Sequence, residues 1–315
     1  MDDLTDPTVP AHADAALDPH VAAPAPRSDR QAFEPLDWGL FVAMGIIWGS
    51  SFLLIKVGLE SFHPGLITWA RVGLGAATLV ALPRARATFA AADSTRILVL
   101  SIVWVAVPFT LFPLAEERIS SAVTGLLNGA VPLFTGIFAA LFFNRRQRGP
   151  QLWGIGVGFV GVACIAIGSG SQDGSSAIGV AMVLVATVFY GLATNLAAPL
   201  QQRYGSVPVM ARMLALATIW TAPFGIFGVP RSDLEWAPVA ATVVLGVIGT
   251  GVAFALMATL VGRVGGPRAS FITYLIPLVS LGLGAIVLDE HVVAMALVGA
   301  ALVLVGAVLA SRAER

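Results

Sequence analysis

Three basic residues lie inside long apolar stretches of this sequence: Lys56, Arg71 and Arg212. A charge at the centre of a bilayer costs about 2.5 to 3.5 kcal/mol, so it needs a partner, a wet cavity or a route to the headgroups. Arg71 lies six residues inside its stretch and could bind an anionic substrate or anchor its helix. Lys56 could pair with Glu60 one helical turn later, and Arg212 could extend towards the headgroups.

Neutral polar and aromatic residues at the middle of other apolar stretches are the remaining candidates for substrate contact. Together with Lys56 and Arg71, the candidate cavity residues are Trp48, Ser50, Ser51, Trp104, Asn128, Tyr190, Asn195, Thr273 and Tyr274. The amides of Asn128 and Asn195 could orient a ligand or join neighbouring helices, and the aromatic rings could form cavity walls or simply pack.

Pro132 and Pro277 each lie inside an apolar stretch. A proline in a helix removes one backbone hydrogen bond and frees a carbonyl. The freed carbonyl could contact a ligand, but we favour a hinge at each proline.

Carboxylates are expected only near the ends of the apolar stretches. Glu60, Glu116, Asp289 and Glu290 could titrate at the outer rim, but we interpret them as solvated charges, and proton coupling is not indicated. The single cysteine, Cys164, excludes an internal disulfide and a cysteine metal cluster, so we expect no metal and no cofactor.

Gly156-Val-Gly158-Phe-Val-Gly161 fits the dinucleotide pattern but has no strand before it, so we interpret it as close helix packing.

The composition identifies the elements that must position these residues. Hydrophobic residues make up 57% of the chain and charged residues only 11%, against roughly 25% charged in soluble domains. The balanced charge provides no basic patch for nucleic acid. Ten apolar segments long enough to cross a bilayer predict an all-α integral membrane protein: residues 38–58, 65–82, 96–114, 119–142, 150–168, 177–198, 208–229, 236–260, 267–288 and 291–310.

The distribution of arginine predicts the orientation of these segments. If the N-terminus is cytoplasmic, the inner side holds Arg84, Arg86, Arg96, Arg145, Arg146, Arg148, Arg203, Arg263, Arg268, Arg312 and Arg315, and the outer loops hold only Arg118 and Arg231. Basic residues accumulate on the cytoplasmic side of bacterial membrane proteins. Both termini are therefore expected in the cytoplasm. Residues 1–36, which are acidic and proline-rich, are expected to form a disordered cytoplasmic tail.

An internal repeat divides the apolar region in two. A shift of 145 residues places Pro132 on Pro277, Gly154 on Gly299 and Gly161 on Gly306, and a weaker match places Trp48-Gly49 on Tyr190-Gly191. Five segments in each copy, residues 37–168 and 177–311, make the two copies inverted in the membrane. Inverted repeats are typical of transporters, because two inverted copies can open to either side by exchanging conformations.

These features resemble the drug/metabolite transporter superfamily in its ten-span EamA-like branch. The resemblance is carried by Trp48-Gly49-Ser50-Ser51-Phe52 with Lys56, by Arg71, by Pro132 and by Leu288-Asp289-Glu290. Asn144-Arg145-Arg146 and Asp289-Glu290-His291 depart from the Gly-Glu-Arg-like corners that many members carry. The resemblance implies export or exchange of small metabolites across the bacterial inner membrane, with spans one, three, four, six, eight and nine around a central cavity.

The sequence therefore predicts a secondary transporter that works by alternating access on a small metabolite, with amino acids and related carboxylates favoured by the two cationic side chains. A passive channel or facilitator is the alternative, and a membrane-embedded enzyme is less favoured because no intramembrane catalytic cluster is visible. The partners expected are a small-molecule substrate and the lipid bilayer. The substrate, the direction, the coupling ion and the choice between monomer and homodimer stay open.

Overall fold

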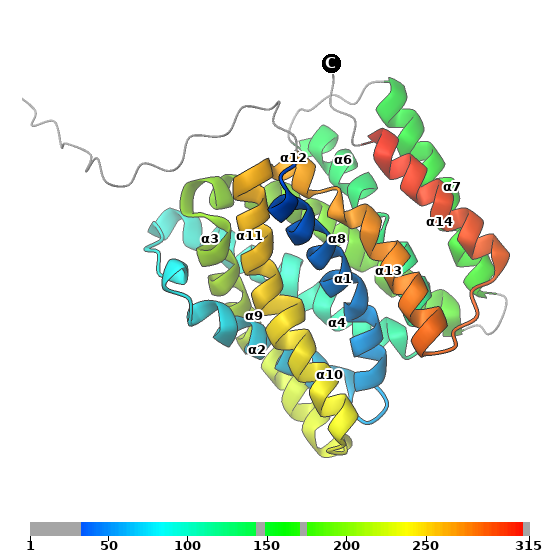
Figure 1. The fold of residues 1–315 in the computed structure, drawn as a ribbon. Helices are drawn as coiled ribbons and strands as arrows, with labels where there is room; N and C mark the ends of the chain where they lie inside the picture. The colour runs from blue at the N-terminus through cyan, green and yellow to red at the C-terminus, as the bar shows by residue number, and fades with distance from the viewer. Residues whose placement is uncertain (1–32, 143–148, 171–174, 311–315) are drawn as a thin grey trace, which may run out of the picture.

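The computed structural model describes residues 33–142, 149–170 and 175–310, and its regular elements are all helices. Figure 1 shows them as one bundle. The first half contains α1 (Pro35–Gly58), α2 (Pro64–Val80), α3 (Ala91–Leu100), η2 (Ser101–Ala106), α4 (Val107–Glu116), α5 (Ser121–Asn128), α6 (Val131–Phe142) and α7 (Gly149–Gly170). The second half contains α8 (Ser175–Tyr204), α9 (Ser206–Gly228), α10 (Trp236–Gly246), η4 (Val247–Val252), α11 (Ala253–Val264), α12 (Gly266–Ala269), α13 (Ile272–Val287) and α14 (Ala294–Ala310). Two short 3-10 turns, η1 (Pro83–Ala85) and η3 (Val229–Arg231), lie in the connections.

These helices form the ten predicted spans. Spans three and eight each consist of two α-helices joined by a π-helical segment, and spans four and nine are each interrupted by a turn. Seven helical stretches of the described chain are long and apolar enough to cross a membrane, and α13 and α14 are shorter apolar helices of 16 and 17 residues. With α2, which has 17 residues, they complete the all-helical ten-span fold.

Local sequence signals set where several helices begin. Pro35 and Pro64 occupy the first turn of α1 and α2, where the missing N–H removes no helical hydrogen bond. Glu34 and Asp37 form a reciprocal capping box at the start of α1. The prediction that the disordered tail extends to residue 36 was therefore wrong at its end, because Glu34 caps α1 and residues 35 and 36 form the start of the helix. Residues 1–32, the Asn144-Arg145-Arg146 corner, Arg148, Arg312 and Arg315 lie outside the described residues.

The inverted repeat is confirmed most directly where α7 crosses α14. A Cβ on Gly161 would come 2.5 Å from the carbonyl oxygen of Gly299, and a Cβ on Gly299 would come 2.6 Å from that of Gly161. Gly154 and Gly306 form the matching pair, at 2.7 and 2.5 Å. The 145-residue shift converts one pair into the other, as a two-fold axis between the repeats requires. The glycines of the dinucleotide-like pattern thus serve helix packing, as we expected.

Spans two, three, seven and eight show the same correspondence between the two repeats. The π-helical segments η2 and η4 lie at corresponding places in spans three and eight, α2 packs against η4, and α9 packs against η2. The weaker match near the start of each repeat also has a structural counterpart. Gly49 faces the side chain of Val279, and Gly191 faces Phe134, which is the residue aligned with Val279. Both halves of the repeat are therefore built alike.

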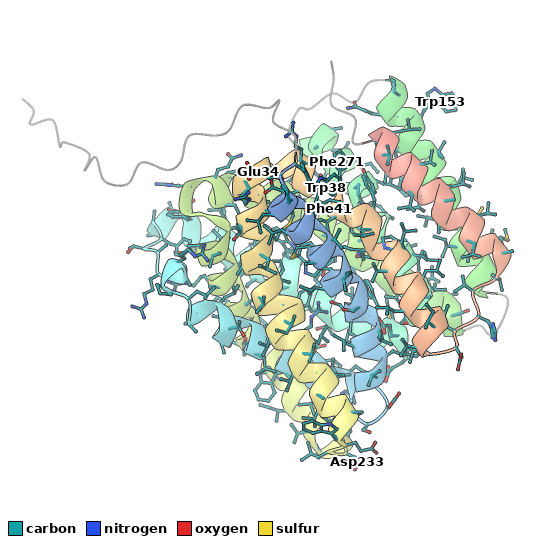
Figure 2. The ribbon with its side chains drawn as sticks, in the orientation of Figure 1. Glu34, Trp38, Phe41, Trp153, Asp233 and Phe271 are labelled. Carbon is teal, nitrogen blue, oxygen red and sulfur yellow. The ribbon has the colours of Figure 1, made fainter. Side chains whose placement is uncertain are left out.

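The outer surface of the bundle is apolar. Trp153 on α7 is 77% exposed, and Leu152, Val160 and Ile286 are also exposed, as expected for side chains that face lipid. Figure 2 places Glu34, Trp38 and Phe41 at one end of the bundle and Asp233 at the other. The start of α1 and the end of α14 lie at the same end (Figure 1).

Two polar clusters join helices at the end of the bundle where α1 begins. Arg263 of α11 donates to Asp37 and pairs with Glu34 at 2.9 Å. Arg203 of α8 pairs with Asp93 of α3 at 3.0 Å, and the Tyr204 hydroxyl donates to the same carboxylate at 2.7 Å. These contacts connect span one to span eight and span three to span six, and they hold this end of the bundle together.

Candidate functional site

Arg71 belongs to span two and is held in the interior by contacts with spans three and eight. Its side chain is 6% exposed, its Nε donates to Thr250 Oγ1 at 3.1 Å, and its guanidinium lies 4.0 Å from the centre of the Phe109 ring. The Thr250 hydroxyl in turn donates to Leu245 O, five residues back, across the π-helical segment η4. Within the described chain, no hydrogen bond uses the two terminal nitrogens of Arg71. Its donors for a bidentate contact with a carboxylate therefore remain available.

Tyr190 and Glu116 lie within electrostatic range of this guanidinium. The Tyr190 ring lies 5.8 Å from the Phe112 ring, which lies 5.6 Å from Phe52. The aromatic surface beside Arg71 therefore runs from α1 through α4 to α8. The surroundings of Arg71 are thus formed by spans two, three, six and eight. Arg71 and these surroundings are the candidate substrate site.

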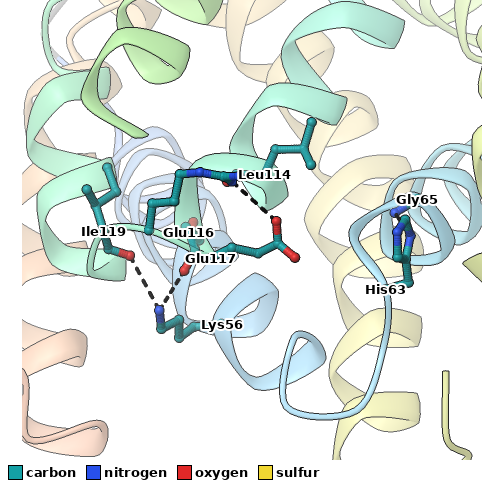
Figure 3. A network of polar contacts seen from close by, with 8 residues as sticks. Lys56, His63, Gly65, Leu114, Glu116, Glu117 and Ile119 are labelled. Carbon is teal, nitrogen blue, oxygen red and sulfur yellow. Dashed lines mark hydrogen bonds and ion pairs between the residues drawn. The ribbon is translucent and has the colours of Figure 1, made fainter. Parts of the chain in front are cut away.

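Lys56 makes different contacts from those that we expected. Its Nζ donates to the carbonyl oxygen of Glu116 at 2.6 Å and to that of Ile119 at 3.4 Å, as Figure 3 shows. The expected ion pair with Glu60 is not formed, because the C-terminal end of α4 offers carbonyls that have no helical partner and carry the negative end of the helix dipole. Lys56 therefore ties span one to span three.

A cavity of about 560 Å³ lies at this end of the bundle. Lys56 is the one predicted site residue in its wall, which is formed by five ionisable residues and two leucines: Lys56, Glu60, Glu116, Glu117, Glu290, Leu59 and Leu288. Its opening is charged, whereas the surroundings of Arg71 are mainly aromatic. Both regions border α4, because Phe109 and Glu116 belong to that helix and, seven residues apart, lie on the same face of it.

The interpretation of Glu116 and Glu290 as solvated rim charges was wrong. Glu116 is 0% exposed, because α4 is covered by α2 and α8 up to its last residue. Glu290 accepts hydrogen bonds from the backbone N–H groups of Ser121 and Ala122 at 2.8 Å each, and from the Ser121 hydroxyl at 3.0 Å. It therefore caps the N-terminus of α5, where a carboxylate is stabilised by the helix dipole.

Several predicted site residues bond to the protein itself. Asn195 Nδ2 donates to Thr135 O and Gly191 O, both at 3.0 Å, and so joins α8 to α6. The Tyr274 hydroxyl donates to Ala307 O at 2.8 Å and joins α13 to α14. Ser50 and Ser51 both donate to Ile47 O in their own helix, at 3.0 and 3.2 Å. Asn195 thus joins neighbouring helices, one of the two expected alternatives, and its contact with a ligand stays a prediction.

Asn128 differs from Asn195, although both are amides inside spans. Its Oδ1 is buried and has no hydrogen-bond partner in the described chain. It is the last residue of α5, at the turn that interrupts span four. Thr273, the position 145 residues later, donates to Ser270 O at 2.7 Å beside the turn in span nine. Asn128 therefore keeps the capacity to contact a ligand.

The aromatic candidates contribute mainly to packing. Trp48 lies edge-on to Phe254 with ring centres 5.9 Å apart, and so joins α1 to α11. Trp104 lies in η2 and packs against the buried cluster formed by spans two, three, six and seven. Trp48 and Tyr190 belong to the same buried cluster, but each is only partly buried there.

The two predicted hinges differ in structure. Pro277 lies inside α13, as expected. Pro132 does not lie in the middle of a helix, because span four is already interrupted at Gly129 and Ala130, and Pro132 is the second residue of the new helix α6. A Cβ on Gly129 would come 3.0 Å from Pro277 Cγ, so the interruption of span four packs against the proline of span nine.

Sequence reasoning missed Phe109, Thr250 and the burial of Glu116. Thr250 and Phe109 contact Arg71 from spans eight and three, and no local pattern identifies such partners. The sequence gives no signal for the burial of Glu116 either, since an acid that ends an apolar run is expected to be solvated. Among the residues that the structure describes, no group of three or more His, Cys, Asp or Glu side chains is arranged to hold a metal.

A ten-span bundle of two inverted repeats around an arginine with available donors defines a membrane transporter. The sequence model of the EamA-like transporter family matches residues 38–167 and again residues 177–312. The chain therefore belongs to the EamA-like transporter family, as the resemblance implied.

Relatives from distant organisms match nearly the whole chain. A probable terminal-alkyne amino-acid exporter of Streptantibioticus cattleyicolor is 27% identical over 286 residues, which cover 87% of this chain and 93% of the relative. A probable amino-acid metabolite efflux pump of Escherichia coli is 23% identical over 283 residues, which cover 86% and 93%. A solved crystal structure aligns with a TM-score of 0.62 at 18% identity, over 87% of this chain and 97% of that one, and so shares the fold.

Proposed function

We propose that this protein exports a small metabolite with a carboxylate group, such as an amino acid, across the bacterial inner membrane by alternating access. The observation that carries the proposal is the buried guanidinium of Arg71, whose terminal nitrogens have no partner in the described chain. A guanidinium binds a carboxylate through two parallel hydrogen bonds. The names of the two relatives, an amino-acid exporter and an amino-acid metabolite efflux pump, support the same substrate class.

Two further features belong to this proposal. Residues 37–168 and 177–311 act as the two repeats that exchange conformations, and the part of the chain that precedes α1 lies in the cytoplasm. The excess of arginine on the side of the chain ends supports a cytoplasmic location for both termini. Phe109, over Arg71, and Tyr190, with Phe112 beside it, supply the apolar wall for the rest of the substrate. Asn128 Oδ1, a buried acceptor without a partner in the described chain, is the proposed contact for an ammonium or amide group.

The test compares metabolites in the medium of bacteria that express the wild type, Arg71→Ala or an empty vector. We expect a few carboxylate-bearing metabolites to accumulate outside only with the wild type, and Arg71→Ala to lower their export by about tenfold or more, which corresponds to about 1.4 kcal/mol or more of lost binding. Arg71→Lys should recover little, because an ammonium cannot form the bidentate contact.

Arg212→Ala is the matched control, because Arg212 lies in the corresponding second span of the other repeat but is exposed, with its guanidinium 5.4 Å from the Phe89 ring. We expect this variant to export at the wild-type rate. Wild-type export by Arg71→Ala, with normal amounts of protein in the membrane, would remove Arg71 from the site. Export that does not saturate would favour the channel over the transporter.

A further inference from the structure

Glu116 is the buried ionisable residue that the substrate site leaves unexplained. It is 0% exposed, and neither oxygen of its carboxylate has a hydrogen-bond partner in the described chain. By contrast, the carboxylate of Glu290, in the wall of the same cavity, accepts three hydrogen bonds. Burial of an ionised carboxylate without a partner costs several kcal/mol, so the neutral acid is the form that this environment favours.

The cations around Glu116 do not neutralise it by direct contact. Lys56 donates to the backbone carbonyls of Glu116 and Ile119 instead of to the carboxylate. Arg71 donates to Thr250 and lies against the Phe109 ring. Arg118 pairs with Glu117 at 3.3 Å and donates to Leu114 O at 2.7 Å. Both Lys56 and Arg71 are nevertheless within electrostatic range of Glu116.

The other groups that face Glu116 oppose its ionisation. Glu290, between α13 and α14, is an acidic neighbour of Glu116, and its carboxylate caps the N-terminus of α5. Glu60, two residues after the end of α1, and Glu117, the residue after α4, line the same cavity. Helix α5 contributes no titratable side chain. Glu116 is therefore poised between neighbouring acids, which favour its protonated form, and two cations, which favour its ionised form.

We propose that Glu116 binds and releases a proton during each transport cycle and so couples export to the proton gradient. A proton from the outer side enters through the cavity beside Lys56 and binds a carboxylate oxygen of Glu116. When the repeats exchange conformations and the surroundings of Arg71 open to the cytoplasm, Arg71 stabilises the carboxylate of Glu116, which releases the same proton to water on that side. One proton thus moves inwards for each substrate molecule that moves outwards. The inference rests on the proposed transport function.

The transport test uses proteoliposomes that contain the full-length protein and a pH-sensitive dye. A mixture of labelled proteinogenic L-amino acids is the probe, and both labelled efflux and internal pH are recorded. We expect the wild type to move protons when the amino acids are added. Glu116→Gln should lower the efflux driven by a pH gradient by about tenfold or more, while exchange of labelled for unlabelled amino acid continues, because exchange needs no net proton movement.

Glu235→Gln is the matched control, because Glu235 is an exposed carboxylate in the connection before α10, outside the cavity wall. It should retain the wild-type response to the pH gradient. If the wild-type protein exchanges amino acids but its efflux does not depend on the pH gradient, the proton site is overturned and the proposed function stands. If the wild-type protein shows neither exchange nor efflux, the proposed function is overturned, and the coupling with it.

A second measurement reads the proton directly and needs no substrate. In the infrared difference between the wild type and Glu116→Gln at neutral pH, we expect the C=O stretching band of one protonated carboxylic acid, sensitive to deuterium exchange. The band should disappear on titration to alkaline pH. Its absence at neutral pH would overturn the proposal, and so would a band that persists through the titration, because such an acid does not release its proton.

Discussion

At the scale of single residues, the polar side chains inside the bundle differ in whether the protein itself satisfies them. Asn195 Nδ2 donates to two backbone carbonyls and joins α8 to α6, whereas Asn128 Oδ1 is buried without a partner in the described chain. A satisfied amide contributes to stability, and an unsatisfied one reduces it unless a ligand supplies the missing bond. The two asparagines therefore predict opposite results when each is replaced by alanine.

Asn195→Ala should destabilise the protein by about 0.6 to 1.7 kcal/mol, the range of hydrogen bonds between membrane helices, and leave the apparent KM for export unchanged. Asn128→Ala should leave the stability unchanged or slightly raised, and raise the KM. Thermal unfolding in detergent and the concentration dependence of export measure the two effects. Equal loss of stability in both variants would mean that Asn128 has a structural partner after all.

At the scale of helices, the crossing of α7 and α14 depends on glycine. The backbones approach so closely that a Cβ on Gly161 would lie 2.5 Å from Gly299 O and 2.6 Å from Val303 N, both of them backbone atoms. Neither atom can move without displacing a whole helix. Gly156 lies in the same helix, and a Cβ there would meet no atom within 4 Å.

We therefore expect Gly161→Ala to destabilise the protein by about 1 to 3 kcal/mol, as overpacking does, with a lower unfolding temperature in detergent. Gly156→Ala should be neutral or should stabilise the helix by up to about 1 kcal/mol, because alanine is the better helix former. If the two variants unfolded at the same temperature, the close approach of α7 and α14 would not contribute to stability.

Spans three and eight, unlike α7 and α14, contain irregular helical segments. The π-helical segments η2 and η4 leave backbone groups with altered partners, and the hydroxyl of Thr250 in η4 both donates to Leu245 O and accepts from Arg71. Irregular backbone inside a membrane protein is tolerated where other groups satisfy it. The candidate site thus lies where the helices are least regular, whereas α7 and α14 are uninterrupted and lie together.

At the scale of the whole molecule, the two ends of the bundle differ. The end where α1 begins is joined by Arg263 with Asp37 and by Arg203 with Asp93. The opposite end contains the cavity of about 560 Å³ beside Lys56. In an alternating-access cycle, the joined end must separate when that side opens.

Cross-linking tests this requirement. In a Cys164→Ser background, Asp37→Cys and Arg263→Cys together provide two thiols where the ion pair stood. A short bis-methanethiosulfonate reagent should bridge them through two reducible disulfide bonds. We expect the bridged protein to lose export and to regain it after the bridge is reduced, whereas either single-cysteine variant should respond to neither treatment. Continued export by the bridged protein would show that spans one and eight stay together throughout the cycle.

The sequence alone determined the architecture of this protein. Hydropathy and length predicted ten spans, and the shift of 145 residues predicted inverted repeats, because a bilayer requires long apolar helices and equal repeats require equal packing positions. The Gly154 and Gly161 pattern identified a close helix contact for the same reason. Arg71 was also recognisable, since a cation deep in an apolar segment stands out without knowledge of its neighbours.

The tertiary structure alone decided what each polar side chain contacts. Lys56 bonds to the end of α4 instead of to Glu60, and Asn195 bonds to Thr135, which is 60 residues away in the chain. Glu116 looked like a solvated charge because it ends a span, yet its neighbours bury it. Hydropathy reports how deep a residue lies along its own helix, but its burial and its partners depend on which other helices surround it, and packing between distant segments sets that arrangement.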